Sequence, residues 1–136
     1  MRDGAALLVA ILCAAHDAAG QSPAAPDSAG GYTAEQALRG AATFRQVCAA
    51  CHVVTQFSGE PFRRAWAGRP ARELYEIIRT TMPQDNPGRL RRAQYADVVA
   101  YFLSLGGTRP GDVDLLPDSA VLSRVTFPLV PEPRHR

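Results

Sequence analysis

Two cysteines and a histidine lie within one short run of the sequence, Cys48-Ala49-Ala50-Cys51-His52. Two thiols with this spacing at a helix end can each add to one vinyl group of a porphyrin, which forms two thioether bonds. The imidazole of His52 is then held below the iron with little conformational entropy left to lose. This C-x-x-C-H pattern is the attachment signature of c-type haem. The sequence therefore predicts one covalent haem c, attached through Cys48 and Cys51 and ligated by His52.

Three other chemistries use the same residue types. A redox-active dithiol would stand at a strand-to-helix junction, whereas the residues before Cys48 have a helical pattern. A zinc site would need a fourth ligand, and beyond residue 20 the only other histidine is His135, in the tail. A disulfide between Cys48 and Cys51 would leave His52 without a role. Haem attachment accounts for all three side chains and is the interpretation that we favour.

Met82 is the candidate for the second axial ligand by elimination. Apart from Met1 it is the only methionine, and all fifteen basic residues are arginine, so no lysine competes. It precedes Pro83, in a segment that we expect to be extended just beyond a helix. A thioether opposite an imidazole raises the reduction potential, and the filled coordination sphere disfavours binding of gases or peroxide. The alternative is that Met82 fills a gap in the core.

Residues 1–20 have the features of a secretory signal peptide. Arg2 precedes an apolar run from residue 5 to residue 15, and the small residues Ala18 and Gly20 stand at suitable cleavage positions. The run is shorter than the roughly 18–20 apolar residues that cross a bilayer. This length favours cleavage over the alternative, an uncleaved membrane anchor. We therefore expect the segment to be removed, the protein to be periplasmic, and the mature chain to have no membrane span.

The remaining chain divides into three parts. Residues 21–31 are rich in Ser, Pro, Ala and Gly, a composition typical of a flexible leader. Residues 32–107 form the predicted compact domain, of a size at which a covalent or metal cross-link is expected to support the small core. Residues 108–136 form a Pro-rich tail with one predicted helical turn over 119–124.

Three main helices are predicted within the compact domain. A capping box of Thr33 and Gln36 begins the first helix, which we expect to continue through Cys51. The spacing of apolar residues predicts the second helix over 71–80 and the third over 90–105, with a glycine pair after the third.

The segment 52–68 has no sustained periodicity and is predicted to be a loop. No alternating strand pattern of useful length occurs in the chain. The fold class is therefore predicted to be all-α, with three main helices and long loops around the haem.

These features resemble the class I c-type cytochromes over the whole of residues 32–107. In that family the N- and C-terminal helices cross, and Gly40, Phe44 and Tyr101 match the residues at the crossing. The resemblance implies that Gly40 lets the helices approach closely and that Phe44 packs with Tyr101 beside the haem. It also implies a small cytochrome c fold with a histidine and a methionine as axial ligands.

Three segments are similar, more narrowly, to the cytochrome c domains that are fused to, or serve, quinoprotein alcohol dehydrogenases: 62–70, 74–83 and 95–101. This similarity implies a quinoprotein (PQQ-type) dehydrogenase as electron donor, and a downstream cytochrome or terminal oxidase as acceptor. It also implies that Trp66 lies by the haem with its indole N–H reaching a propionate. A tryptophan of the protein core fits the same position equally.

The segment after His52 departs from the family pattern. Many members have a glycine soon after this histidine and then a proline, whose carbonyl accepts the second N–H of the ring. Here no proline occurs before Pro61. The resemblance therefore does not identify the group that orients His52, although such groups tune the metal.

The net charge of +2 is too small to indicate a nucleic-acid binder, but it is unevenly distributed. Residues 60–92 contain eight arginines and four acidic residues, whereas 21–59 are neutral and 93–136 carry a net charge of −1. The basic segment includes the candidate methionine ligand. Its arginines either steer an acidic partner or pair with Glu73 and Glu76.

The sequence therefore predicts a periplasmic monohaem cytochrome c that carries single electrons between redox proteins and is not an enzyme. The alternative is a haem enzyme or a gas or redox sensor with a labile sixth ligand.

Overall fold

The structure is a computed structural model that describes residues 31–130. Its elements are α1 (Ala34–Val47), the 3₁₀ turn η1 (Cys48–Ala50), α2 (Thr55–Ser58), α3 (Glu60–Trp66), α4 (Ala71–Thr81), α5 (Arg92–Leu105) and α6 (Ser119–Arg124). Within the described residues the only β pairing is an isolated bridge between Pro70 and Thr126. The predicted all-α fold is confirmed. The predicted signal peptide, the leader up to residue 30, His135 and the end of the tail lie outside the described residues.

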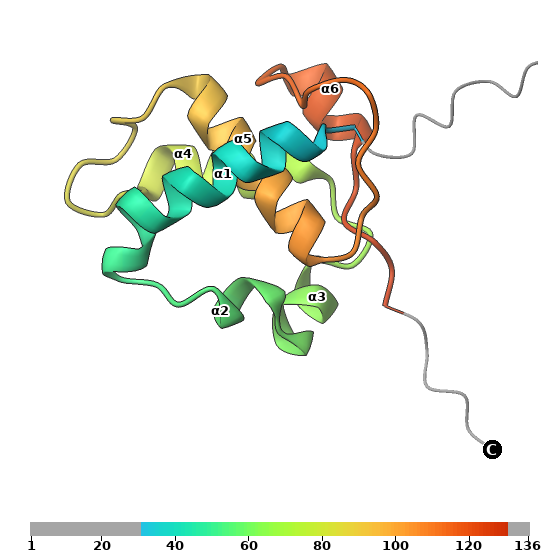
Figure 1. Ribbon diagram of the computed structural model, residues 1–136, viewed down its shortest axis with the longest axis horizontal. Helices are drawn as coiled ribbons and strands as arrows, with labels where there is room; N and C mark the ends of the chain where they lie inside the picture. The colour runs from blue at the N-terminus through green and yellow to red at the C-terminus, as the bar shows by residue number, and fades with distance from the viewer. Residues whose placement is uncertain (1–30, 131–136) are drawn as a thin grey trace, which may run out of the picture.

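The crossing of α1 and α5 forms the centre of the molecule (Figure 1). A Cβ atom on Gly40 of α1 would lie 1.9 Å from the backbone oxygen of Asp97 and 2.9 Å from the Cβ of Tyr101, both on α5. No side chain fits at such distances. Glycine at this position therefore sets how closely the two helices approach.

The first helix begins as predicted but is fixed differently at both ends. The Thr33 side chain accepts a hydrogen bond from the Gln36 N–H at 3.0 Å, as in a capping box. The buried Gln36 side chain does not complete that box; it bonds the backbone oxygen of Leu115 at 2.9 Å and accepts from its N–H at 2.6 Å. The α-helix ends at Val47 and continues as η1, whereas the sequence predicted α-helix through Cys51.

The loop prediction for 52–68 is wrong, because this segment contains α2 and α3. Each helix is too short to show a periodic pattern, and an isolated helix of this length is unstable in water. Tertiary packing stabilises them: Phe57 stacks on Phe102 of α5 with ring centroids 4.4 Å apart, and Phe62 packs edge-to-face against Phe127 at 6.0 Å.

The described part of the tail returns across the domain. The N–H of Ala71, at the start of α4, donates to the Val125 oxygen at 2.7 Å. Gly68 donates to the Phe127 oxygen, and Phe127 to the Arg69 oxygen, both at 3.0 Å. The helical turn predicted over 119–124 is confirmed as α6.

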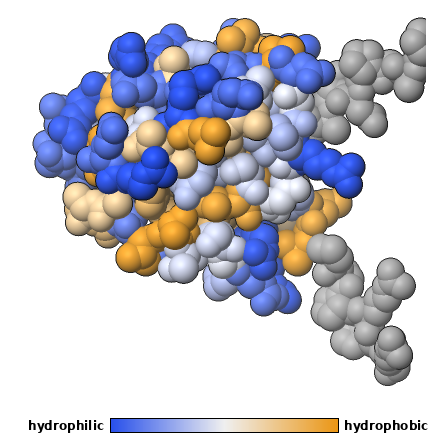
Figure 2. Space-filling view, in the orientation of Figure 1, coloured by the Kyte–Doolittle hydropathy of each residue, from blue (hydrophilic) through white to orange (hydrophobic). Residues whose placement is uncertain are grey.

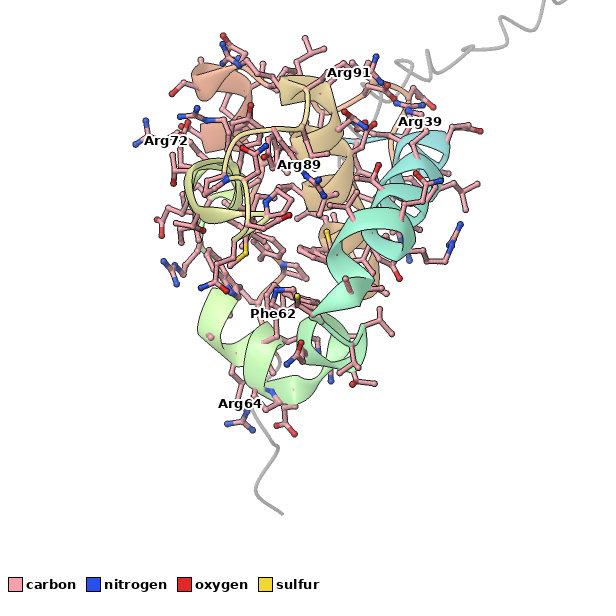
Figure 3. The ribbon with its side chains drawn as sticks, turned by 90° about the vertical axis from the view of Figure 1, so that its left-hand side faces the viewer. Arg39, Phe62, Arg64, Arg72, Arg89 and Arg91 are labelled. Atoms are coloured by element: carbon pink, nitrogen blue, oxygen red, sulfur yellow. The ribbon has the colours of Figure 1, made fainter. Side chains whose placement is uncertain are left out.

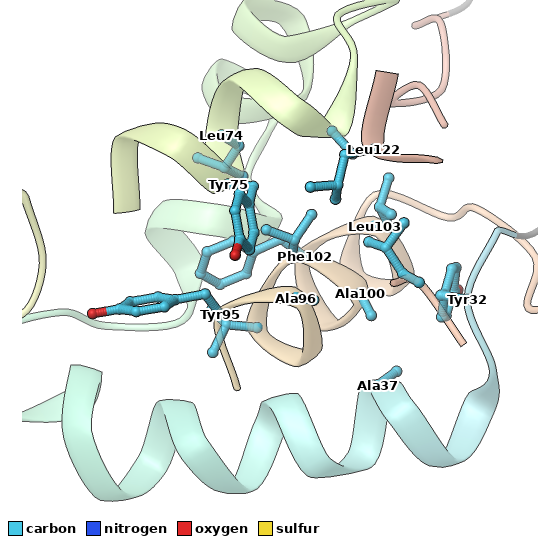
Figure 4. Close-up of a cluster of buried hydrophobic side chains, with 14 of the residues drawn as sticks. Tyr32, Ala37, Leu74, Tyr75, Tyr95, Ala96, Ala100, Phe102, Leu103 and Leu122 are labelled. Atoms are coloured by element: carbon cyan, nitrogen blue, oxygen red, sulfur yellow. The ribbon is translucent and has the colours of Figure 1, made fainter. Parts of the chain in front are cut away.

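One apolar core joins α1, α4, α5 and the tail (Figure 4). Figure 4 labels the buried residues Tyr32, Ala37, Leu74, Tyr75, Tyr95, Ala96, Ala100, Phe102, Leu103 and Leu122. None of the helices among residues 31–130 is long and apolar enough to cross a membrane.

Candidate metal centre

The two cysteines and the histidine lie where α1 ends. The N–H of Cys51 donates to the Cys48 oxygen at 3.1 Å, and the N–H of His52 donates to the same oxygen at 3.0 Å. This tight turn carries the three side chains on one short stretch of backbone. Both thiols are free, with Cys48 half-buried and Cys51 exposed. Burial raises the pKa of the Cys48 thiol.

The imidazole of His52 is held by a side chain from α2. Its Nδ1 lies 3.2 Å from Oε1 of Gln56. The ring also packs edge-on against Phe57, with centroids 5.5 Å apart and an interplanar angle of 72°. Because Nδ1 is engaged, Nε2 is the ring nitrogen left to ligate a metal.

Aromatic side chains connect this turn to the core. Phe57 packs on Phe44 of α1 at 5.6 Å and on Phe62 of α3 at 5.7 Å, in addition to its stack on Phe102. In Figure 2 a band of apolar surface runs over the region between α1 and α2. Val53, 63% exposed, lies on the link between η1 and α2, so the surroundings of the histidine are apolar and accessible.

Met82 is the first residue after α4. Its backbone is extended, with φ −125° and ψ 150°, as predicted from the following proline. The Tyr95 hydroxyl donates to the Met82 oxygen at 2.7 Å and accepts from the Leu90 N–H at 3.4 Å. One side chain of α5 therefore closes the loop that carries the methionine.

Figure 3 looks at the side of the molecule where this loop lies. The sulfur atoms, drawn in yellow, are visible in the middle of that view, above the labelled Phe62. Within residues 31–130 the sulfur-containing residues are Cys48, Cys51 and Met82. The sulfur atoms of these residues therefore project onto the central region of that view.

Residues 35–102 match the family model described as cytochrome c oxidase, cbb3-type, subunit III, which spans half of the chain. The chain belongs to this family. The matched segment is a c-type cytochrome domain, a kind of domain that binds haem c and carries electrons between redox proteins. No curated protein and no solved structure matches the chain.

The residues of this cytochrome domain fit haem c. The donor set is two thiols, an imidazole and a thioether, which are the groups that attach and ligate such a haem. In addition, the Tyr75 side chain is only 1% exposed, and its hydroxyl has no hydrogen-bond partner within the described residues. Leaving a buried hydroxyl unpaired costs about 1–3 kcal/mol, so an acceptor from a bound group would offset this cost. Tyr75 lies near the methionine loop, because its ring packs edge-to-face on Tyr95 at 6.5 Å.

Phe44 and Tyr101 lie at the helix crossing of the cytochrome domain. Their ring centroids are 5.9 Å apart and tilted by 58°. Trp66 lies at the end of α3, half-buried between Phe62 at 5.9 Å and Phe127 at 5.6 Å. The Arg69 guanidinium covers its ring at 4.0 Å. These contacts give Trp66 a packing role, and its contact with a propionate stays a prediction.

Sequence reasoning missed two residues of the site. Gln56 reaches His52 only because α2 forms, and no apolar periodicity in the sequence predicts that helix. Tyr95 reaches Met82 across thirteen positions of sequence, a contact that depends on how α4 packs against α5. A polar residue four positions after the histidine was the one available signal for Gln56.

Proposed function

We propose that this protein is a single-electron carrier in which Cys48 and Cys51 attach one haem c while His52 and Met82 ligate its iron. When bound, haem c supplies an iron that alternates between the ferric and ferrous states, gaining or losing one electron. The observation that supports this most strongly is the fixed His52 ring within the C-x-x-C-H run, because its Nε2 is free for a metal.

The role of the chain is to position the ligands and exclude water. The thioether bonds from Cys48 and Cys51 would fix the haem beside His52. The closed loop from Met82 to Leu90 would hold the Met82 side chain as the second ligand. The stack of Phe57 on Phe102 supplies an apolar wall, which lowers the local dielectric constant near the metal.

The oxidised and reduced spectra distinguish this carrier from a haem enzyme or gas sensor. We expect the ferric protein to have the long-wavelength methionine-to-iron charge-transfer band, and the ferrous protein not to bind carbon monoxide at neutral pH. Absence of the band, or ready carbon monoxide binding, would contradict the carrier function. A pyridine haemochrome assay that fails to show two thioether bonds would instead favour the dithiol or zinc alternatives.

We infer further that residues 1–20 are a cleaved signal peptide and residues 21–31 a leader, and that residues 108–136 form a tail whose described part packs on the cytochrome domain. Export to the periplasm is consistent with haem attachment to two free thiols. N-terminal sequencing of the protein from the periplasmic fraction should begin at Gln21. An intact N-terminus in the membrane fraction would show that the segment anchors the protein.

For the electron donor we propose a quinoprotein alcohol dehydrogenase, with a cytochrome or terminal oxidase as acceptor. Three segments of the sequence, 62–70, 74–83 and 95–101, resemble the cytochrome domains of such dehydrogenases. The family description, which names an oxidase subunit, is consistent with an oxidase as acceptor.

The surface charge supports an acidic docking site on the donor. Glu73 pairs with Arg69 at 2.5 Å, and Glu76 pairs with Arg79 at 2.8 Å. Figure 3 labels Arg72, in the first turn of α4, and Arg89 and Arg91, which precede α5; we call these three residues the basic face. None of its members pairs with a carboxylate within residues 31–130. Unpaired arginines on the basic face would attract an acidic surface and raise the encounter rate.

The donor is tested by mixing the purified protein with candidate dehydrogenases and following haem reduction as a function of ionic strength. We expect reduction by a quinoprotein dehydrogenase that slows as salt is added. A reduction rate that is independent of salt would contradict the docking role of the arginines. If the haem is not reduced at all, a quinoprotein dehydrogenase is excluded as the donor.

A further inference from the structure

The hydrogen bond to His52 comes from a side chain, in a segment whose sequence has no proline until Pro61. Oε1 of Gln56 lies 3.2 Å from Nδ1 of His52 and 3.2 Å from the backbone nitrogen of Val53. The amide group of Gln56 thus faces two neighbours with the same oxygen atom.

These two contacts assign the protons. The Val53 N–H can only donate, so the Gln56 atom that meets it must be the carbonyl oxygen and not the NH₂ group. An oxygen in that place can only accept from His52. Nδ1 therefore carries a proton, and Nε2 is left with the lone pair that binds iron.

Backbone hydrogen bonds hold Gln56 where it can do this. Its N–H donates to the Val53 oxygen at 3.0 Å, and the Phe57 N–H donates to the Val54 oxygen at 2.9 Å. The next side chain, Phe57, is anchored by its stack on Phe102. Gln56 is therefore placed by a turn that the aromatic core fixes from the other side.

We propose that Gln56 is a positioning residue for the iron ligand: its side-chain oxygen fixes the ring orientation and tautomer of His52 and sets how strongly Nε2 donates to iron. The inference rests on the proposed function, because it requires His52 to be the axial ligand. A stronger acceptor on Nδ1–H makes the imidazole a better electron donor. Ferric iron gains more from that donation than ferrous iron, so a stronger acceptor lowers the reduction potential.

The test is to measure the midpoint potential of the holoprotein and two variants. Gln56→Glu keeps the length of the side chain and replaces a neutral acceptor by a charged one, so its potential should fall. Gln56→Leu removes the acceptor, so its potential should rise. Mutation of the groups that orient metal ligands typically costs about 10–100-fold in metal affinity or activity. We expect at least about tenfold in the ferric–ferrous equilibrium, which is ~59 mV for one electron.

Gln46 provides the matched control, because it is exposed and stands two residues before Cys48. Gln46→Glu introduces the same charge close to the motif without a contact to the imidazole. The difference between Gln56→Glu and Gln46→Glu therefore isolates the hydrogen bond from the added charge. Equal shifts in these two variants would overturn the proposal.

A second measurement follows the bond itself. In the ferrous protein the His52 Nδ1–H proton should exchange slowly with solvent and give its own NMR signal, and Gln56→Leu should speed its exchange. A potential and an exchange rate unchanged in Gln56→Leu would overturn the role of Gln56. Failure of the proposed function looks different, because the wild-type protein would then lack the methionine-to-iron band or the two thioether bonds.

Discussion

Tyr95 stabilises the methionine loop at the scale of a single hydroxyl group. It is 2% exposed and bonds both ends of the segment between Met82 and Leu90. Replacing a phenol by phenylalanine removes only these bonds and leaves the packing of the ring on Tyr75 in place. A substitution of this hydroxyl therefore tests the placement of Met82 without changing the packing of the core.

Tyr95→Phe should weaken the hold on Met82 without removing it. A lost hydrogen bond of this kind costs about 0.5–1.5 kcal/mol, which corresponds to as much as a tenfold easier displacement of the thioether. The measurement is a titration of the ferric protein with imidazole, followed by loss of the methionine-to-iron band. Tyr101→Phe removes the same atom at the helix crossing and should leave the titration unchanged. Equal midpoints for Tyr95→Phe and wild type would show that the loop does not depend on this hydroxyl.

At the scale of elements, the contact between α1 and α5 has no room for a side chain at Gly40. Alanine would raise helix propensity by about 1 kcal/mol, so that local effect alone favours the substitution. The backbone oxygen of Asp97, 1.9 Å from the added carbon, cannot move without separating the helices. Steric repulsion should therefore exceed the gain in propensity.

Gly40→Ala is accordingly expected to lower the free energy of unfolding of the holoprotein by about 1–3 kcal/mol or more, measured by denaturant titration. In Gly106→Ala, a glycine after α5, the nearest atom would be 3.3 Å from the added carbon, and little change is expected. If Gly40→Ala were as stable as Gly106→Ala, the helices would not be held at this distance.

A second link between elements depends on pH. The Thr33 hydroxyl donates to Asp114, and Arg39 pairs with the same carboxylate, so the start of α1 is tied to the segment after α5. The hydrogen bond from Thr33, and then Arg39, holds the pKa of Asp114 below its ordinary 3.8. Because the folded pKa is the lower one, the link stabilises the fold above pH 3.8 and is lost as the pH falls through the lowered value.

Asp114→Asn should reduce the loss of stability between neutral and acid pH, measured as the unfolding free energy at a series of pH values. The carboxylate is 41% exposed, so solvent screening limits the effect to about 0.2–1 kcal/mol. Asp112→Asn changes an exposed neighbour and serves as the control. A pH profile of Asp114→Asn that follows the wild type would contradict this link.

At the scale of the whole molecule, unpaired charges are distributed unequally. Arg64 pairs with Glu60 and Arg39 with Asp97, so these two arginines in the view of Figure 3 are partly neutralised. Arg89, near the middle of the same view, is exposed and pairs with no carboxylate in the described residues. Its charge is therefore available to a partner that docks on this side.

Arg89→Gln should slow reduction by an acidic partner at low ionic strength by roughly twofold to fivefold, and the effect should vanish near 1 M salt, where the Debye length is about 3 Å. Arg124→Gln changes the net charge equally and is the control. Arg124 ends α6, at the upper right of Figure 1, whereas the link between α4 and α5 that carries Arg89 lies at the left. The rate constants of haem reduction, measured by stopped-flow mixing, show whether the slowing comes from a local docking contact or from the change in net charge. Equal slowing in both variants would exclude a docking role for this arginine.

The sequence alone predicted the chemistry of the centre and located the main helices. The C-x-x-C-H run and the single methionine beyond the first residue are local patterns, and their meaning depends on spacing within a few residues. The helices over 34–47, 71–81 and 92–105 have apolar periodicity and end signals that act within one or two turns. The all-α fold follows from these local signals.

Only the tertiary structure decided what holds the ligands. The helices α2 and α3 form because Phe57 and Phe62 pack on distant aromatic rings, so no local pattern predicts them. The acceptor on His52 depends on α2, and the clamp on Met82 depends on the packing of α4 against α5. Contacts between residues far apart in sequence arise from the whole fold, and the surroundings of both candidate axial ligands are of this kind.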